Sequence, residues 1–265
     1  MSKDIFKKID QKYSDLGENP LHYLKGLYHS KPTTYWDYIQ VDTLLSLQKP
    51  KTDFKDETVF IIYHQVTELV LKLMIHEVCQ VTTSEHLTED LFKDKLKRLI
   101  RYTDMLITSF DVMKDGMSYE DYNQFRLSLT PASGFQSAQF RFLEIYCTPL
   151  INLIHQSQRQ NLPKHPSISD YFEHIYWKSA GYSPKKKSKS LTLSLFENKY
   201  LEDLKVLATD VKGNTLSEKL QDLENPSEEL INYMKTFDHA YNVKWPLVHL
   251  NTAKHYLDKK GENKK

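Results

Sequence analysis

From Asp56 to about Thr82, apolar residues recur at helical spacing and cover most of the circumference of the helix that they predict. Asp56 is a suitable N-cap, because its side chain can accept hydrogen bonds from the first free backbone N–H groups. An apolar surface on nearly all sides is typical of a helix buried in a core. A second run, from Phe92 to Met113, is apolar every three or four residues and predicts an amphipathic helix packed on the first.

Glycine is scarce, with 7 among 265 residues, whereas soluble proteins average about 7 per cent. The sequence therefore lacks the turn residues that a sheet protein needs, and we predict an all-α fold in one large domain over residues 1–265. Aromatic residues are frequent, with 17 tyrosines, 12 phenylalanines and 3 tryptophans. They can fill a core or form the flat walls of a site for an aromatic ligand.

The first 34 residues, 1–34, predict an irregular or partly helical arm that can reach a neighbouring subunit. Prolines and a lysine cluster divide residues 156–225 into shorter helical pieces, which we interpret as a variable helical insert. Asn225 as cap and Pro226 at the first helical position predict the start of the last long helix, and Pro246 is expected to kink it. Further helices are expected over residues 35–47, around Tyr122 and Arg126, and from Ala138 to about Leu153.

A formal net charge of +1 gives no strong electrostatic attraction to nucleic acid or to an anionic membrane. The basic cluster at 185–189 is interpreted as a solvated loop. Two cysteines, Cys79 and Cys147, show no paired-ligand spacing and indicate a reducing compartment. The start MSKDIFKKID lacks the apolar core of a signal peptide, and no uninterrupted apolar run is long enough for a membrane span. We therefore expect a cytoplasmic protein.

Several ionisable side chains occur among apolar residues of the predicted helices, where burial would cost free energy unless they are hydrogen-bonded. His64 and Glu68 lie four residues apart in the middle of the apolar helix. Either a core histidine hydrogen-bonded to a neighbour or a polar group that faces a ligand would account for them. Arg126 follows Tyr122 by one turn, and its guanidinium suits a carboxylate. His249 stands beside the expected kink, and a long helix that presents one histidine can hold haem iron.

The stretch Thr130-Pro131-Ala132-Ser133-Gly134-Phe135-Gln136-Ser137 sets a serine and a glycine turn at the start of the next helix. It follows Arg126 directly and precedes Phe140-Arg141. An arginine, a serine and a turn beside a helix start indicate a binding site.

Five blocks together resemble the tryptophan 2,3-dioxygenase family in their order and spacing. The resemblance is strong over residues 33–145 and 226–257, and residues 156–225 agree only in length and helical character. The blocks are Tyr35-Trp36-Asp37-Tyr38 through Gln48, Phe60-Ile61-Ile62-Tyr63-His64-Gln65 with Glu68-Leu69, Tyr122 to Arg126, Ser133 to Ser137 with Phe140-Arg141, and Trp245 with His249.

The resemblance implies an all-helical enzyme that binds b-type haem between helices. Such an enzyme inserts O2 across the indole C2–C3 bond of L-tryptophan, giving N-formylkynurenine at the first step of tryptophan degradation. On these blocks His249 matches the iron ligand, with Trp245 one turn before it on the cofactor side. His64 matches the catalytic distal histidine that contacts the indole N–H, and Phe60 matches the indole wall.

Further positions follow from the same resemblance. Arg126 and Tyr122 match the residues that hold the substrate carboxylate. Ser133 matches a serine near the haem and the substrate ammonium group. Tyr35 and Tyr38 match tyrosines that close the pocket of an adjacent subunit, which implies a homo-oligomer, expected to be a tetramer.

The family continues past the histidine that His249 matches into a glycine- and threonine-rich loop that contacts the substrate. The present sequence ends at Lys265 before such a loop. Two alternatives therefore remain open: a related haem oxygenase acting on another indole or aromatic amine, and a haem-binding or haem-sensing protein without turnover. A purely structural bundle gives no reason for His64, Arg126, Ser133 and His249 to occur together.

Overall fold

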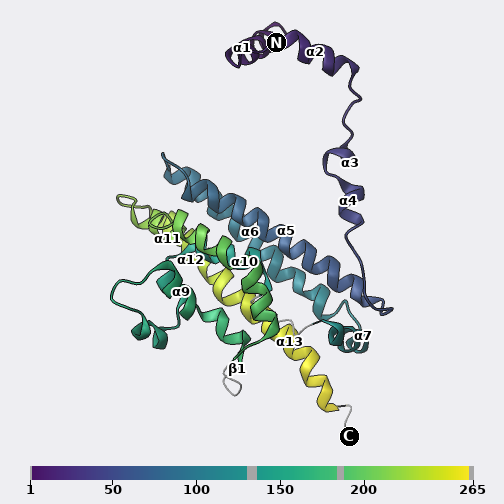
Figure 1. Cartoon of the computed structure of the whole chain (residues 1–265), viewed down its shortest axis with the longest axis vertical. Helices are drawn as coiled ribbons and strands as arrows, with labels where there is room; N and C mark the ends of the chain where they lie inside the picture. The colour runs from purple at the N-terminus through teal and green to yellow at the C-terminus, as the bar shows by residue number, and fades with distance from the viewer. Residues whose placement is uncertain (1, 130–135, 184–187, 263–265) are drawn as a thin grey trace. The chain divides into compact units, whose positions relative to one another are not determined.

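The computed structural model describes residues 2–129, 136–183 and 188–262, which separate into two compact units, Met1–Gln48 and Lys49–Lys265. The elements are helical apart from one short hairpin, so the prediction of an all-α fold is confirmed (Figure 1). A single domain with an arm over 1–34 stays a prediction.

The first unit consists of four helices. α1 (Ser2–Asp15) and α2 (Pro20–His29) pack together, with the rings of Tyr13 and Tyr23 stacked at 4.3 Å. The helix expected over 35–47 is interrupted, because Gln40 adopts a left-handed conformation with φ 53° between α3 (Tyr35–Tyr38) and α4 (Val41–Leu45).

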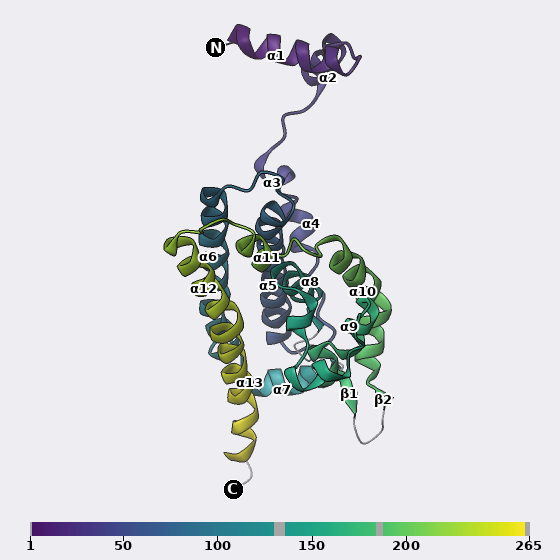
Figure 2. The same ribbon diagram turned by 90° about the vertical axis from the view of Figure 1, so that its left-hand side faces the viewer.

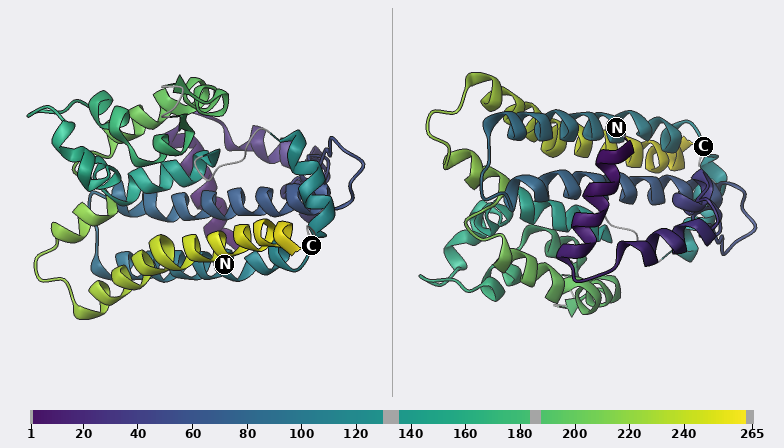
Figure 3. Two further views of the ribbon diagram at one scale, coloured as in Figure 1. Left: turned by 90° about the horizontal axis from the view of Figure 1, so that it is seen from below. Right: turned by 90° about the horizontal axis from the view of Figure 1, so that it is seen from above.

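Long helices form the core of the second unit. α5 extends from Asp56 to Thr82, close to the predicted bounds, and α6 (Glu89–Lys114) packs along it. The prediction of Asp56 as N-cap is wrong, because Lys55 occupies the cap position and the Asp56 carboxylate accepts from the Ser118 N–H. α12 (Glu228–His239) and α13 (Trp245–Glu262) lie on α6, as Figures 2 and 3 show. Met74, Val78, Leu96 and Leu99 are fully buried between these helices, and their removal from water stabilises the bundle.

Shorter elements cover α5 on the other side. α8 (Ala138–Cys147) packs on α5, and α10 (Leu191–Asp210) packs on α8 around a second apolar cluster that includes Phe172 and Leu193. The remaining elements of this unit are α7 (Tyr119–Phe125), η1 (Arg126–Ser128), η3 (Leu150–Leu153), η4 (Gln156–Asn161), α9 (Ile168–His174), η5 (Tyr176–Gly181), the hairpin β1 (Tyr182–Ser183) with β2 (Ser188–Lys189), and α11 (Leu216–Gln221).

Two helix boundaries differ from the expected ones. The helix from Ala138 ends at Cys147 rather than near Leu153, because Pro149 disfavours the helical conformation of Thr148, which is extended at φ −152° and ψ 152°. The last long helix is capped by Ser227, whose Oγ accepts from the Leu230 N–H, and not by Asn225, which has φ 55°. The residues 156–225 contain one helix of 20 residues, α10, where only short pieces were expected.

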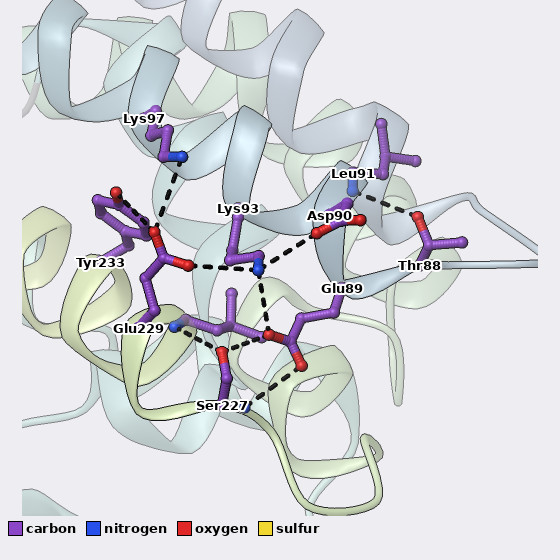
Figure 4. A network of polar contacts seen from close by, with 10 residues as sticks. Thr88, Glu89, Asp90, Leu91, Lys93, Lys97, Ser227, Glu229 and Tyr233 are labelled. Atoms are coloured by element: carbon purple, nitrogen blue, oxygen red, sulfur yellow. Dashed lines mark hydrogen bonds and ion pairs between the residues drawn. The ribbon is translucent and has the colours of Figure 1, made fainter.

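The start of α12 is tied to α6 by a polar network (Figure 4). Ser227 donates through its N–H and Oγ to Glu89, while Lys93 Nζ lies 3.4 Å from Glu89 and 3.3 Å from Glu229. Tyr233 donates to Glu229 at 3.1 Å. Exposed ion pairs of this kind stabilise little individually, so the network fixes the register of α12 on α6 more than it adds stability.

α5 is not buried on all sides, contrary to the sequence expectation. Ile62, Val66, Leu69 and Leu73 form a stripe whose members are between 39% and 47% exposed. By length and composition alone, α5 could also cross a membrane. A long core helix has the same length and composition, and α5 packs on α6 and α8.

Candidate functional site

α5 and α7 bring aromatic rings together at the start of the bundle. Ser118 caps α7, and its backbone N–H donates to the carboxylate of Asp56 at the start of α5. The ring of Phe60 therefore lies 6.3 Å from that of Tyr122 and 5.5 Å from that of Phe125, measured between centroids. Phe125 is fully buried, whereas Phe60 and Tyr122 are half-buried. These rings form an aromatic wall with an accessible side.

His64 stands on this wall, with its ring centroid 4.0 Å from that of Phe60. Its Nδ1 lies 2.7 Å from the backbone oxygen of Phe60. Because a carbonyl oxygen only accepts, Nδ1 carries the proton and Nε2 of the neutral ring is an acceptor. The ring is solvent-exposed, yet desolvation by the surrounding protein lowers the pKa of His64, and the nearby charge of His249 lowers it further. The neutral form is thus favoured at neutral pH.

His249 approaches the same region from α13. Its ring centroid lies 5.8 Å from that of Phe110, which in turn lies 5.8 Å from the ring of Tyr63. The Tyr63 ring lies 5.5 Å from that of His64, so two rings connect the imidazoles. Desolvation lowers the pKa of His249 as well. In the described part of the chain no hydrogen bond engages its ring, so an unprotonated nitrogen is available to a ligand.

Arg126 begins η1, directly after α7. Its guanidinium carbon lies 5.5 Å from the centroid of the Tyr122 ring, and the residue is half-buried. No acidic partner of Arg126 is found among the residues described. Tyr122 is itself held by Tyr256, whose ring lies 4.3 Å away and whose hydroxyl donates to the Met113 carbonyl. A guanidinium on a fixed ring is suited to bind a carboxylate.

Glu68, which shares a helix face with His64, has a structural partner. Its carboxylate accepts from the Ser137 hydroxyl and from the Gln139 backbone N–H at the start of α8. Desolvation nevertheless raises the pKa of Glu68. Of the two explanations that the sequence left open, the hydrogen-bonded one applies to Glu68, while His64 keeps a free Nε2.

Other predicted site residues are placed elsewhere or are outside the described residues. Trp245 is 8% exposed and packs with its ring 5.2 Å from Phe140, inside the core and one turn before His249. Tyr35 and Tyr38 belong to the first unit and are 74% and 81% exposed. Ser133 and the turn from Thr130 to Phe135 lie outside the described residues.

The resemblance implies a haem, whose iron needs a ligand from the protein. Among residues 2–129, 136–183 and 188–262, no three His, Cys, Asp or Glu side chains come together as a set of metal ligands. Cys79 and Cys147 are free thiols. One neutral imidazole from the protein is enough to hold haem iron, because the porphyrin supplies four nitrogen ligands of its own. His249 therefore fits an axial ligand of haem.

Three neighbours of the site were not identified from the sequence. Phe110 lies against His249, Phe125 against Phe60, and Tyr256 against Tyr122. All three are buried, with exposures of 7%, 0% and 2%. Only the packing of α6, α7 and α13 shows that they also support site residues.

Comparisons with known proteins show the family of this chain. The family model described as Tryptophan 2,3-dioxygenase matches residues 26–189, more than half of the chain. A tryptophan 2,3-dioxygenase of Ruegeria sp. (strain TM1040) is 41% identical over 113 residues, which are 42% of this chain and 40% of that protein. That of Bacillus thuringiensis subsp. konkukian (strain 97-27) is 37% identical over 133 residues, 48% of this chain and 47% of that protein.

A third relative, the tryptophan 2,3-dioxygenase of Anaeromyxobacter sp. (strain K), is 39% identical over 117 residues, 44% of each chain. The chain thus spans less than half the length of the curated relatives it matches. Phe60, His64, Tyr122 and Arg126 lie within the stretch that the family model matches, whereas Trp245 and His249 lie beyond it.

Proposed function

Since the chain belongs to the tryptophan 2,3-dioxygenase family, we propose that it is a haem-dependent dioxygenase that converts L-tryptophan and O2 to N-formylkynurenine. The observation that carries the proposal is the aromatic wall of Phe60 and Tyr122, which carries His64 at one end and Arg126 at the other. This arrangement can hold a haem on one side and an aromatic amino acid on the other.

His249 is proposed as the residue that would hold the iron of haem b. Its nitrogens are free in the described chain, and its lowered pKa favours the unprotonated form that binds iron. Trp245 supports this turn of helix from the core, and Ser133 is proposed to face the haem and the substrate ammonium. Haem iron, when bound, supplies the activation of dioxygen.

The chain's own residues orient the substrate. The guanidinium of Arg126 binds the carboxylate, and the hydroxyl of Tyr122 assists it. Phe60 packs against the indole ring, and Nε2 of His64 accepts the indole N–H as a hydrogen bond. With both ends of the amino acid fixed, C2 and C3 of the indole are held in one position for reaction.

Assembly into a homo-oligomer, a tetramer by family resemblance, is part of the proposal. The apolar stripe of Ile62, Val66, Leu69 and Leu73 is exposed on α5, and such a stripe is commonly covered in an assembly. The exposed Tyr35 and Tyr38 are proposed to close the pocket of a neighbouring subunit. A cytoplasmic location is proposed on the same grounds as from the sequence.

The test is direct assay of the haem-loaded protein. The protein is reduced without oxygen, mixed with L-tryptophan and exposed to air, and N-formylkynurenine is measured by mass spectrometry. We expect product with L-tryptophan and none with indole-3-propionate, which lacks the ammonium group. Product from other indoles alone would favour the related oxygenase, and bound haem without product would favour a haem sensor. Failure to bind haem would overturn the proposal.

A further inference from the structure

A buried cluster outside the site joins a carboxylate, a guanidinium and a phenol. Arg141 and Glu144 are 5% and 7% exposed, and Arg141 Nη1 lies 2.8 Å from Glu144 Oε2. The same Nη1 donates to the Tyr176 hydroxyl at 2.7 Å, and that hydroxyl donates to Glu144. The three groups close a ring between α8 and η5. Buried charges persist when they are paired and hydrogen-bonded, so each member holds the others in place.

The cluster reaches α13 through one aromatic ring. The guanidinium carbon of Arg141 lies 4.3 Å from the centroid of Phe140. Phe140 in turn stacks on Tyr241 at 5.1 Å and packs against Trp245 at 5.2 Å. Trp245 is one turn before His249 on α13. The path from the charged cluster to the proposed iron ligand therefore consists of packed side chains as far as Trp245 and of one helical turn from there.

The helix changes its geometry where this ring packs. Residues Ala240–Lys244 form a π turn, in which the Trp245 N–H donates to the Ala240 carbonyl five residues earlier. Pro246 follows and has no N–H to donate. One extra residue in a turn changes the phase of the helix by about 100°. The π turn therefore decides which side of α13 carries His249, and such turns are frequent at functional sites.

The π turn has a cost at Tyr241. The hydroxyl of Tyr241 is buried and has no hydrogen-bond partner among the described residues. A buried polar group without a partner costs free energy, so other contacts must keep the ring where it is. The Tyr241 ring contacts the rings of Phe140, Trp245 and Phe237. Of these, only Phe140 belongs to another element that is held by buried charges.

We propose that Arg141, Glu144 and Tyr176 are positioning residues for His249, acting through Phe140 on the π turn Ala240–Lys244. The inference rests on the proposed function, since it takes His249 as the haem ligand. The cluster holds the Phe140 ring against Tyr241 and Trp245, and this contact maintains the helix phase that directs the imidazole to iron. The three residues touch neither substrate nor haem in this role.

Two variants test the path, one in the charged cluster and one at the aromatic ring that connects the cluster to α13. Tyr176→Phe removes only the hydroxyl that joins Arg141 to Glu144, and Phe140→Leu removes the ring that transmits the contact. The matched control is Glu77→Gln, because Glu77 is also buried and paired, with Lys95 Nζ at 2.8 Å. Glu77 lies thirteen residues beyond His64 on α5, about 20 Å along the helix.

The readouts are the iron–histidine stretching band of the reduced haem protein and the rate of haem transfer to apomyoglobin. The unfolding midpoint of each haem-free variant is measured in parallel. Substitution of a residue that orients a metal ligand typically lowers metal affinity about tenfold or more. We expect Tyr176→Phe and Phe140→Leu to shift the band and to speed haem transfer about tenfold. Glu77→Gln should lower the unfolding midpoint and leave band and rate unchanged.

Three results would overturn the positioning role. The band and the transfer rate of Tyr176→Phe could equal those of the wild type, which would leave the haem assignment standing. Glu77→Gln could move the band as much as Tyr176→Phe, which would indicate general loosening of the bundle. A wild-type protein without any iron–histidine band would overturn the proposed function, and the positioning role with it. If Phe140→Leu does not fold, the single-hydroxyl variant Tyr176→Phe still decides.

Discussion

The two halves of α5 have similar apolar content and different surroundings. In the C-terminal half, Val70, Leu71, Met74, Val78 and Val81 are at most 4% exposed. In the N-terminal half, Ile62, Val66 and Leu69 are between 39% and 47% exposed, and His64 is open to solvent. Apolar composition thus identifies a core helix, but the neighbouring helices decide which of its residues they cover. Most of the exposed apolar side chains lie in the half that carries the proposed site, and Leu73 continues the stripe into the other half.

Polar groups differ between the halves in the same way. Glu77 in the C-terminal half is buried and paired with Lys95, whose Nζ lies 2.8 Å away. His64 in the N-terminal half uses only Nδ1, on its own helix, and keeps Nε2 free. The Glu77 carboxylate is thus satisfied within the fold, whereas the Nε2 atom of His64 is left for a ligand.

The largest expected effect contrasts two neighbouring positions of α5. Met74→Ala should destabilise the protein by about 2–5 kcal/mol, because it opens a cavity at a fully buried side chain. Leu73→Ala, at a position 47% exposed in the single subunit, should change the stability of the separated subunit by no more than about 0.5 kcal/mol. Urea unfolding of the two variants measures both values. Equal losses would break the distinction between the covered face and the exposed stripe.

The next effect tests whether the open region binds an amino acid. Arg126→Leu should raise KM for L-tryptophan about tenfold or more, because a charge-assisted contact is worth about 1.5–3 kcal/mol. Steady-state kinetics with Arg101→Leu, an exposed arginine of α6, provides the control. An unchanged KM in Arg126→Leu would remove Arg126 from the carboxylate site.

A smaller effect concerns the protonation of His64. Desolvation lowers its pKa below 6.5, so the ring stays neutral at pH 7 and Nε2 can accept the indole N–H. The value of kcat/KM should therefore be constant near neutral pH and fall only as the pH drops below 6.5, when Nε2 gains a proton. A pH profile of the wild type beside His64→Gln measures this, and the fall should be absent in the variant. A fall of equal size in both would assign it to another group.

Local sequence signals predicted the elements better than they predicted the junctions. The bounds of α5 follow from its apolar spacing and its acidic start. The break at Gln40 carries no glycine or proline to signal it, and the cap at Ser227 competes with the equally plausible Asn225. The end of α8 does have a local signal, because Pro149 disfavours the helical conformation of Thr148 before it.

The site could be predicted as a set of residues, but not as an arrangement. His64 and Arg126 follow from the family blocks. The contact between Phe60 and Tyr122 depends on the bond between Ser118 and Asp56, which are 62 positions apart. The π turn before Pro246 depends on the packing of Phe140, which no local pattern around His249 reveals.

Absorption spectroscopy of the haem-loaded protein tests the central claim most directly. The wild type is compared with His249→Ala and with His255→Ala, whose half-buried ring lies on the same helix against Tyr256. We predict that the wild type and His255→Ala retain histidine-ligated haem through gel filtration. His249→Ala should lose it and regain the spectrum on addition of imidazole. A His249→Ala protein that keeps haem with an unchanged spectrum would contradict the account.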